Sequence, residues 1–204
     1  MIAGLDEAGR GPVIGPMVVC GVLLKENDLE RLKLAGVKDS KLLTPRKREA
    51  LADFIKTVVK KHILIHISPK EIDDAENLNE LEAMKFAQII NSLNPSLAFV
   101  DSTDPNPSLF KERLLRYLKL KPRLVIENSA DRKYVQVAAA SILAKVERDA
   151  EIEKLRREYG DFGSGYPADP KTRDFLSRWI KEKGEFPPFV RKSWKTIKKL
   201  ENSP

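Results

Sequence analysis

The sequence contains little cysteine and little histidine. Of its 204 residues, one is a cysteine, Cys20, and two are histidines. A single cysteine cannot form an internal disulfide, which indicates a reducing compartment. So few sulfur and imidazole ligands nearly exclude a zinc site of the usual type. Because Cys20 follows the apolar residues Met17, Val18 and Val19, we interpret it as a buried, inert thiol rather than a reactive one.

Long apolar runs are also absent. No run could span a bilayer, and the start, MIAGLDEAGR, lacks the basic region and apolar stretch of a secretory signal. We therefore expect a cytoplasmic protein with no membrane partner. Hydrophobic residues make up 42% of the chain and charged residues 33%, which is typical of a globular protein. The length suits one domain with an appendage.

Positive charge is concentrated at the C-terminal end. The net charge is +7, and from Lys171 onward ten Lys and Arg residues face four Asp and Glu residues, so six of the seven net charges lie there. The aromatic residues Phe175, Trp179, Phe186, Phe189 and Trp194 are interleaved with these charges. This pattern suits a polyanion with stackable bases or sugars, and it equally suits a small helical subdomain with a basic face and an aromatic core.

Hydrophobic periodicity predicts an α/β fold. Three strands come first, and helical segments then alternate with two further strands, so the later strands should be parallel in a mixed sheet covered by helices. The predicted strands are residues 2–5, 13–24, 62–68, 97–100 and 123–126. The predicted helices are residues 46–61, 79–93, 108–118, 132–159 and 171–183.

Acidic residues follow three of these strands. Asp6 and Glu7 come directly after residues 3–5, Asp101 comes directly after residues 98–100, and Asp131 follows residues 124–126 by a short link. Because ligands bind at the carboxyl ends of parallel strands, these acids could converge on one edge of the sheet. Converging carboxylates repel one another unless cations lie between them, and Mg²⁺ prefers such oxygen ligands. Acids at strand ends are also common as helix caps, and for Asp131 alone a cap is the favoured interpretation.

Three glycines, Gly9, Gly11 and Gly15, follow the first predicted strand. Their spacing is wrong for a dinucleotide-binding fingerprint, and Pro12–Pro16 leads into a strand rather than a helix. A glycine-rich turn beside acids instead brings bare backbone close to a ligand.

At these residues the sequence resembles ribonuclease HII, the type 2 ribonuclease H, in its archaeal single-chain form. The resemblance covers nearly the whole chain and rests on motifs that occur in the family's order: GLDEAGRGPVIGP at 4–16, KDSKL at 38–42, VDS at 100–102, AD at 130–131, VAAASILAKV at 137–146 and GSGYP at 163–167. It implies a ribonuclease H-like mixed five-stranded sheet flanked by helices in a catalytic domain, residues 1–159. It also implies a C-terminal basic helical extension, residues 160–204, that contributes to substrate binding.

The resemblance implies an endoribonuclease that hydrolyses the RNA strand of RNA–DNA hybrids, including single ribonucleotides in duplex DNA, and leaves 5′-phosphate and 3′-hydroxyl ends. Two metal ions, Mg²⁺ or Mn²⁺, would be held by four catalytic carboxylates. Substrate would be bound by eight further residues. The carboxylates are Asp6, Glu7, Asp101 and Asp131, and the substrate-binding residues are Gly9, Arg10, Gly11, Ser40, Lys41, Ser141, Lys145 and Tyr166.

Other interpretations stay open at several of these positions. Ser141 and Lys145, four residues apart, share a helix face, and ordinary helix surface is the less favoured alternative there. Tyr166 taken without the resemblance favours a structural role. The whole chain could be another ribonuclease H-like enzyme, such as an exonuclease or a resolvase, or a non-catalytic nucleic-acid-binding protein. We expect a monomer, and a replication clamp is a possible partner that the sequence does not establish.

Overall fold

The computed structural model of the protein describes residues 1–38 and 40–201. Asp39, the second residue of the KDSKL motif, lies outside the described residues. The described chain divides into two compact units. Unit 1 contains residues 1–8, 18–65 and 77–147, and unit 2 contains residues 9–17, 66–76 and the chain from Arg148 onward.

Five strands form one mixed sheet in the order β3-β2-β1-β4-β5. β1 pairs antiparallel with β2 and parallel with β4, and β4 pairs parallel with β5. The predicted mixed five-stranded sheet is therefore confirmed, with its later strands parallel. The strands are β1 (Ile2–Ala8), β2 (Met17–Leu24), β3 (Lys61–Ile67), β4 (Leu97–Asp101) and β5 (Arg123–Glu127).

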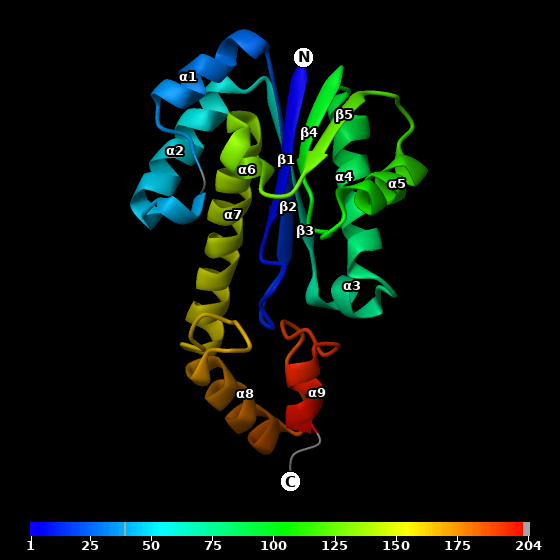
Figure 1. Ribbon diagram of the computed structural model, residues 1–204. Coiled ribbons are helices and arrows are strands. Elements are labelled where there is room, and N and C mark those ends of the chain that lie inside the picture. The colour runs from blue at the N-terminus through cyan, green and yellow to red at the C-terminus, as the bar shows by residue number, and fades with distance from the viewer. Residues whose placement is uncertain (39, 202–204) are drawn as a thin grey trace. The chain divides into compact units, whose positions relative to one another are not determined.

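Helices connect and cover the strands. Within unit 1, α1, α2 and the first part of α7 lie on one side of the sheet, and α4 and α5 lie on the other (Figure 1). The α-helices are α1 (Leu29–Leu34), α2 (Pro45–Val58), α3 (Pro69–Asp74), α4 (Leu78–Leu93), α5 (Pro107–Tyr117), α6 (Ala130–Lys133), α7 (Val135–Tyr159), α8 (Pro170–Lys183) and α9 (Lys195–Glu201), and short 3₁₀ turns occur at Glu26–Asp28 (η1) and Ser40–Leu42 (η2).

The core of unit 1 packs α7 very closely against β1. A β-carbon built at Gly4 would lie 2.2 Å from the carbonyl oxygen of Gln136 in α7, so only glycine permits this approach. The alanine-rich face of α7, with Ala138 and Ile142, joins Val18 and Cys20 of β2 in one apolar cluster. Cys20 is fully buried, and burial raises the pKa of its thiol, as expected of an inert thiol.

Unit 2 has an apolar core of its own, and aromatic residues of the C-terminal segment build much of it. Phe175, Phe186 and Phe189 are buried with Val13 and Ile14, and both tryptophans pack against this cluster. The ring of Tyr159 lies 4.4 Å from that of Phe189, centroid to centroid. These rings therefore form a core, so the aromatic-core interpretation of this segment holds.

Two predicted elements differ from the structure. Residues 13–16 do not belong to strand β2, because two prolines and Gly15, with φ of +85°, interrupt the extended chain. The predicted helix 132–159 is divided at Tyr134, whose extended backbone (φ −122°, ψ 113°) ends α6 before α7 begins. The short helices α1, α3 and α9 were not predicted.

No helix in the described ranges 1–38 and 40–201 is long and apolar enough to cross a membrane.

Candidate active site

Strand register brings the first carboxylates together. Leu5 of β1 pairs with Val100 of β4, so Asp6 and Asp101 follow at the same level on adjacent parallel strands. One carboxylate oxygen each from Asp6, Glu7 and Asp101 lies within 4.8 Å of the others. Three acids from two neighbouring strands thus form a cluster of oxygen atoms at one edge of the sheet, as the sequence predicts.

A hydrogen bond between α6 and the end of β4 brings Asp131 toward this edge. The amide of Ala130, the first residue of α6, donates a hydrogen bond of 2.6 Å to Oδ1 of Asp101. This bond draws the start of α6, and with it Asp131, toward the end of β4. Asp131 is not part of the three-carboxylate cluster, but its charge contributes to raising the pKa of Asp101. It lies inside α6, whose N-cap residue is Ser129, so Asp131 is not the helix cap.

The electrostatics of the cluster are those of a site that favours cations. Burial raises the pKa of Asp6 well above its usual value, and the negative charges of Glu7 and Asp101 raise it further. Burial also raises the pKa of Asp101 to about 7; the Ala130 hydrogen bond opposes this shift, and the charges of Glu7 and Asp131 add to it. The repulsion that disfavours three anions here is relieved when divalent cations bind among their oxygens.

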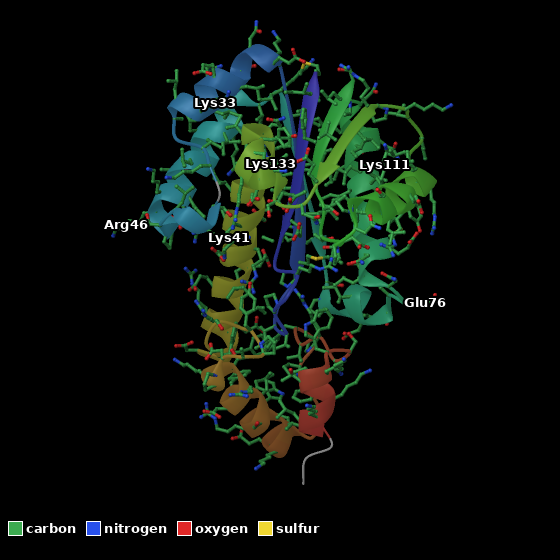
Figure 2. The ribbon with its side chains drawn as sticks, in the orientation of Figure 1. Lys33, Lys41, Arg46, Glu76, Lys111 and Lys133 are labelled. Atoms are coloured by element: carbon green, nitrogen blue, oxygen red, sulfur yellow. The ribbon has the colours of Figure 1, made fainter. Side chains whose placement is uncertain are left out.

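Polar residues of unit 1 surround the carboxylates. Ser40 and Ser141 are both about 5% exposed, and their hydroxyl oxygens lie 3.1 Å apart in a hydrogen bond. A hydrogen bond from Ser141 lowers the pKa of Asp6 and so favours its anionic form. Lys41 is exposed, projects from the segment before α2 (Figure 2), and its charge lowers the pKa of Asp101. Lys145 follows Ser141 by about one turn on α7 and is half-buried.

The loop of residues 9–15, called the glycine loop below, and Tyr166 belong to unit 2, where they lie next to each other. The amides of Val13 and Ile14 donate to the carbonyl of Gly165, at 2.8 and 3.3 Å. A β-carbon at Gly11 would lie 3.4 Å from the ring of Tyr166, which is 46% exposed. Two predicted substrate-binding positions are thus adjacent, and the tyrosine ring is available to a ligand.

The loop that carries Tyr166 is held by many hydrogen bonds. Asp169 accepts a hydrogen bond from the amide of Ser164 at 2.7 Å. This bond, with the other hydrogen bonds to the same carboxylate, lowers the pKa of Asp169 to about 2. Buried Thr172 accepts from the amide of Gly165 at 3.0 Å and donates to the carbonyl of Phe162 at 2.8 Å. The exposed ring of Tyr166 therefore stands on an ordered loop.

Three further residues of unit 2 that the sequence did not single out are Arg191, Arg148 and Asp73. Arg191 is fully buried and donates to the loop's carbonyl groups. Arg148 is 5% exposed, and its Nε and Nη2 are buried and make no hydrogen bond within the described part of the chain. Asp73 of α3 accepts from the amides of Lys192 and Ser193. Nothing in the sequence separates Arg191 from the nine other basic residues of its segment, because burial is a tertiary property.

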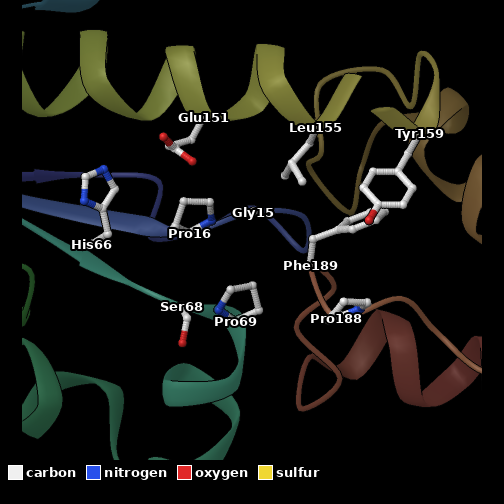
Figure 3. Close-up of a pocket in the computed structure, with 10 residues that line it drawn as sticks. All are labelled: Gly15, Pro16, His66, Ser68, Pro69, Glu151, Leu155, Tyr159, Pro188 and Phe189. Atoms are coloured by element: carbon white, nitrogen blue, oxygen red, sulfur yellow. The ribbon is translucent and has the colours of Figure 1, made fainter. Parts of the chain in front are cut away.

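Unit 2 also contains a pocket with a volume of about 540 Å³. Glu151 and His66 lie toward one end of it, and Tyr159 and Phe189 toward the other (Figure 3). None of the predicted catalytic or substrate-binding residues lines this pocket. The chemistry is therefore assigned to the carboxylate cluster and not to the pocket.

A mixed five-stranded sheet with clustered acids at the ends of adjacent parallel strands defines a metal-dependent nuclease of the ribonuclease H-like class. Comparison with known proteins identifies the group within this class. The family model described as "Ribonuclease HII" matches residues 3–197. A ribonuclease HII of Thermococcus sibiricus is 48% identical over 203 residues, which cover 98% of this chain and 91% of that protein.

Solved structures agree with this assignment. The crystal structure of the ribonuclease H2 from Pyrococcus horikoshii OT3 matches with a TM-score of 0.93 and 48% identity, covering 98% of this chain and 96% of that one. The ribonuclease HII in the PCNA complex from Archaeoglobus fulgidus matches with a TM-score of 0.89 and 44% identity, covering 100% of this chain and 98% of that one. The chain belongs to the ribonuclease HII family. It is a metal-dependent endoribonuclease that cleaves RNA in RNA–DNA hybrids.

Proposed function

We propose that this enzyme cleaves the RNA strand both in long hybrids and at single ribonucleotides embedded in duplex DNA, leaving 5′-phosphate and 3′-hydroxyl ends. The cluster of Asp6, Glu7 and Asp101 at the ends of two parallel strands carries the proposal. We assign Asp131, whose charge acts on Asp101, as the fourth catalytic carboxylate. The cytoplasm is the proposed compartment, because the chain has a single cysteine, which indicates a reducing environment.

The residues of the cluster fit Mg²⁺ or Mn²⁺. Every candidate ligand is a carboxylate oxygen, the donor type that both cations prefer. Burial and mutual repulsion raise the pKa values of Asp6 and Asp101, which supports the proposal that cations balance the charge of the cluster. When bound, two such ions supply an activated water and stabilise the leaving oxygen of the phosphodiester.

The chain's own residues hold and orient this chemistry. The hydrogen bond from Ser141 partly offsets the burial and repulsion that raise the pKa of Asp6, and Ser40 in turn forms a hydrogen bond with the hydroxyl of Ser141. We propose that exposed Lys41 and half-buried Lys145 bind phosphates on either side of the cleaved bond, where Ser40 and Ser141 would complete the phosphate contacts.

Recognition of the ribose is assigned to unit 2. We propose that the backbone of Gly9, Arg10 and Gly11 contacts the 2′-hydroxyl and its phosphate, because this hydroxyl distinguishes RNA from DNA. Tyr166, exposed beside Gly11, would pack on the sugar next to the cleaved bond. The exposed basic residues of α8 and α9 would bind the phosphate backbone further along the duplex.

The decisive experiment uses three duplexes of one sequence: a hybrid, a DNA duplex with one ribonucleotide, and an all-DNA duplex. Cleavage of the first two in Mg²⁺, silenced by EDTA and by Asp101→Asn, is the expected result. Glu112→Gln, which removes an exposed carboxylate of α5, serves as the matched control. Cleavage of the all-DNA duplex would indicate another ribonuclease H-like nuclease instead, and an intact single-ribonucleotide duplex would refute the proposal.

A sliding clamp is the proposed protein partner of an otherwise monomeric enzyme. The relative from Archaeoglobus fulgidus was crystallised with PCNA. Co-elution of this protein with its own PCNA in size-exclusion chromatography would support the partnership, and separate elution at micromolar concentrations would argue against it.

A further inference from the structure

Arg191, in the C-terminal segment, donates hydrogen bonds to carbonyl groups of the glycine loop. Its Nη2 donates to the carbonyl of Gly9 at 2.6 Å, its Nη1 to that of Arg10 at 2.8 Å and its Nε to that of Gly15 at 3.0 Å. Trp194, whose ring lies 5.2 Å from the guanidinium carbon, donates through Nε1 to the carbonyl of Gly11 at 3.3 Å. All of these residues belong to unit 2.

These bonds determine which way the loop's amides face. A trans peptide is planar, so the N–H of each residue points opposite to the carbonyl of the residue before it. Because Arg191 binds the carbonyls of Gly9 and Arg10, the N–H groups of Arg10 and Gly11 face away from Arg191. The carbonyls of Gly11 and Gly15 precede Pro12 and Pro16, which have no N–H. The loop therefore presents two successive N–H groups, an arrangement that binds anions and hydroxyl oxygens.

Glycine is required where this orientation is set. Gly9 has a φ of +86°, and a β-carbon there would lie 2.9 Å from the carbonyl oxygen of Pro16 and 3.1 Å from Nε of Arg148. A residue with a β-carbon would be strained at this turn, so the path of the loop depends on glycine at position 9.

A buried arginine at this place carries a desolvation cost. Burial, together with the charge of Arg148, lowers the pKa of Arg191 to about 9. An apolar side chain of similar volume would avoid that cost but would leave three carbonyl groups of the loop without this donor. Arg191 supplies a planar set of donors that fixes the direction of several peptide groups at once.

We propose that Arg191 is a positioning residue for ribonucleotide recognition: it fixes the Gly9–Gly11 backbone so that the N–H groups of Arg10 and Gly11 meet the 2′-hydroxyl and its phosphate. This inference rests on the proposed function. It assigns the contribution of the C-terminal segment to ribonucleotide specificity to one buried residue, Arg191. The segment acts on recognition through Arg191 and not only through its surface charge.

The test measures discrimination, which a merely structural role would not change. Dissociation constants are compared for a duplex with one ribonucleotide and for the same duplex made of DNA, in Mg²⁺ and in an Asp101→Asn background that prevents cleavage. Arg191→Met is expected to lower the preference for the ribonucleotide at least tenfold, and Arg191→Lys to restore part of it. Arg157→Met, which removes an exposed guanidinium from the same unit, is the matched control and should leave the preference unchanged.

Trp194→Phe keeps the result decisive if Arg191→Met does not fold. It keeps an aromatic ring beside Arg191, although a smaller one, and removes the Nε1 donor, so the preference should fall about threefold with little change in melting temperature. Unchanged preference in folded Arg191→Lys and Trp194→Phe would overturn the inference. A cleaving wild type that binds both duplexes equally would also overturn it, whereas a wild type that cleaves neither ribonucleotide substrate would refute the proposed function itself.

Discussion

Replacing Asp101 with asparagine is expected to abolish cleavage and, without metal, to stabilise the protein at pH 8. The variant loses an anionic oxygen from the cluster with Asp6 and Glu7. Its amide oxygen can still accept the hydrogen bond from Ala130, so the tether to α6 is kept. The substitution therefore removes charge repulsion while preserving the local hydrogen bonding and packing.

The magnitude follows from the raised pKa of Asp101. A carboxyl whose pKa is about 7 when folded and 3.8 when unfolded binds its proton more tightly in the folded state. The charged form of Asp101 therefore lowers the free energy of unfolding. This destabilisation is absent below about pH 4, grows between about pH 4 and pH 7, and is complete above pH 7. The full shift corresponds to about 4 kcal/mol. Partial exposure and coupling to Glu7 reduce the expected gain to about 2 kcal/mol, or about 4–8 °C in melting temperature for a chain of this length.

Thermal melts of wild type and Asp101→Asn in EDTA, at pH 4.5 and pH 8, measure this effect. The variant should melt higher at pH 8 and at nearly the same temperature at pH 4.5. Adding Mg²⁺ at pH 8 should raise the melting temperature of the wild type more than that of the variant. Glu112→Gln controls for the loss of any one negative charge. An equal gain at both pH values, or a destabilised variant at pH 8, would refute the reasoning.

Four further outcomes are expected. Tyr166→Ala should lower cleavage at a single ribonucleotide more than within a long hybrid, with little change in melting temperature; equal losses on both substrates would show that the tyrosine only supports the site. Gly9→Ala should lower kcat/KM at least tenfold, because the left-handed turn and the nearby Pro16 carbonyl oppose a β-carbon; a fully active variant would contradict this. Deleting residues 171–204 should prevent cooperative folding of unit 2, whose core would lose Phe175, Phe186 and Phe189; an intact melting transition in circular dichroism would count against that core. Changing the exposed basic residues 178, 181 and 183 together to glutamine should reduce the salt dependence of duplex binding by up to about 0.9 in slope for each lost phosphate contact; an unchanged slope would mean that α8 does not touch the duplex.

Local signals explain which elements could be predicted. Thr44 followed by Pro45 predicts the start of α2, and the side chain of Thr44 does accept a hydrogen bond from the amide of Lys47. α3 was missed although its signal is present: Ser68 and Glu71 form a capping box around Pro69. The division of the predicted helix 132–159 carried no such signal. It follows from the tether between Ala130 and Asp101, which fixes α6 independently of α7.

The sequence by itself determined the chemical character of the site. Strand periodicity followed at once by Asp6, Glu7 or Asp101 predicts acids at the carboxyl ends of strands, because side chains and strand ends are local properties of the chain. Together with the ordered motifs, this was sufficient for the family and for the mixed sheet. It did not establish that Asp6 and Asp101 are level with each other, since strand order and register depend on pairing between distant segments.

Only the tertiary structure decided which residues of the C-terminal segment are buried and which are exposed. In the sequence, its cations and aromatic residues suit a nucleic-acid surface and a small core equally well. Folding separates the two roles: Phe175 and Phe189 are buried, Lys181 and Lys183 stay exposed, and Arg191 is buried against the carbonyls of the glycine loop. The sequence does not distinguish a buried arginine from an exposed one. Which of them holds the loop depends on burial and hydrogen-bond geometry, and these arise only when residues 9–15 and 191 meet.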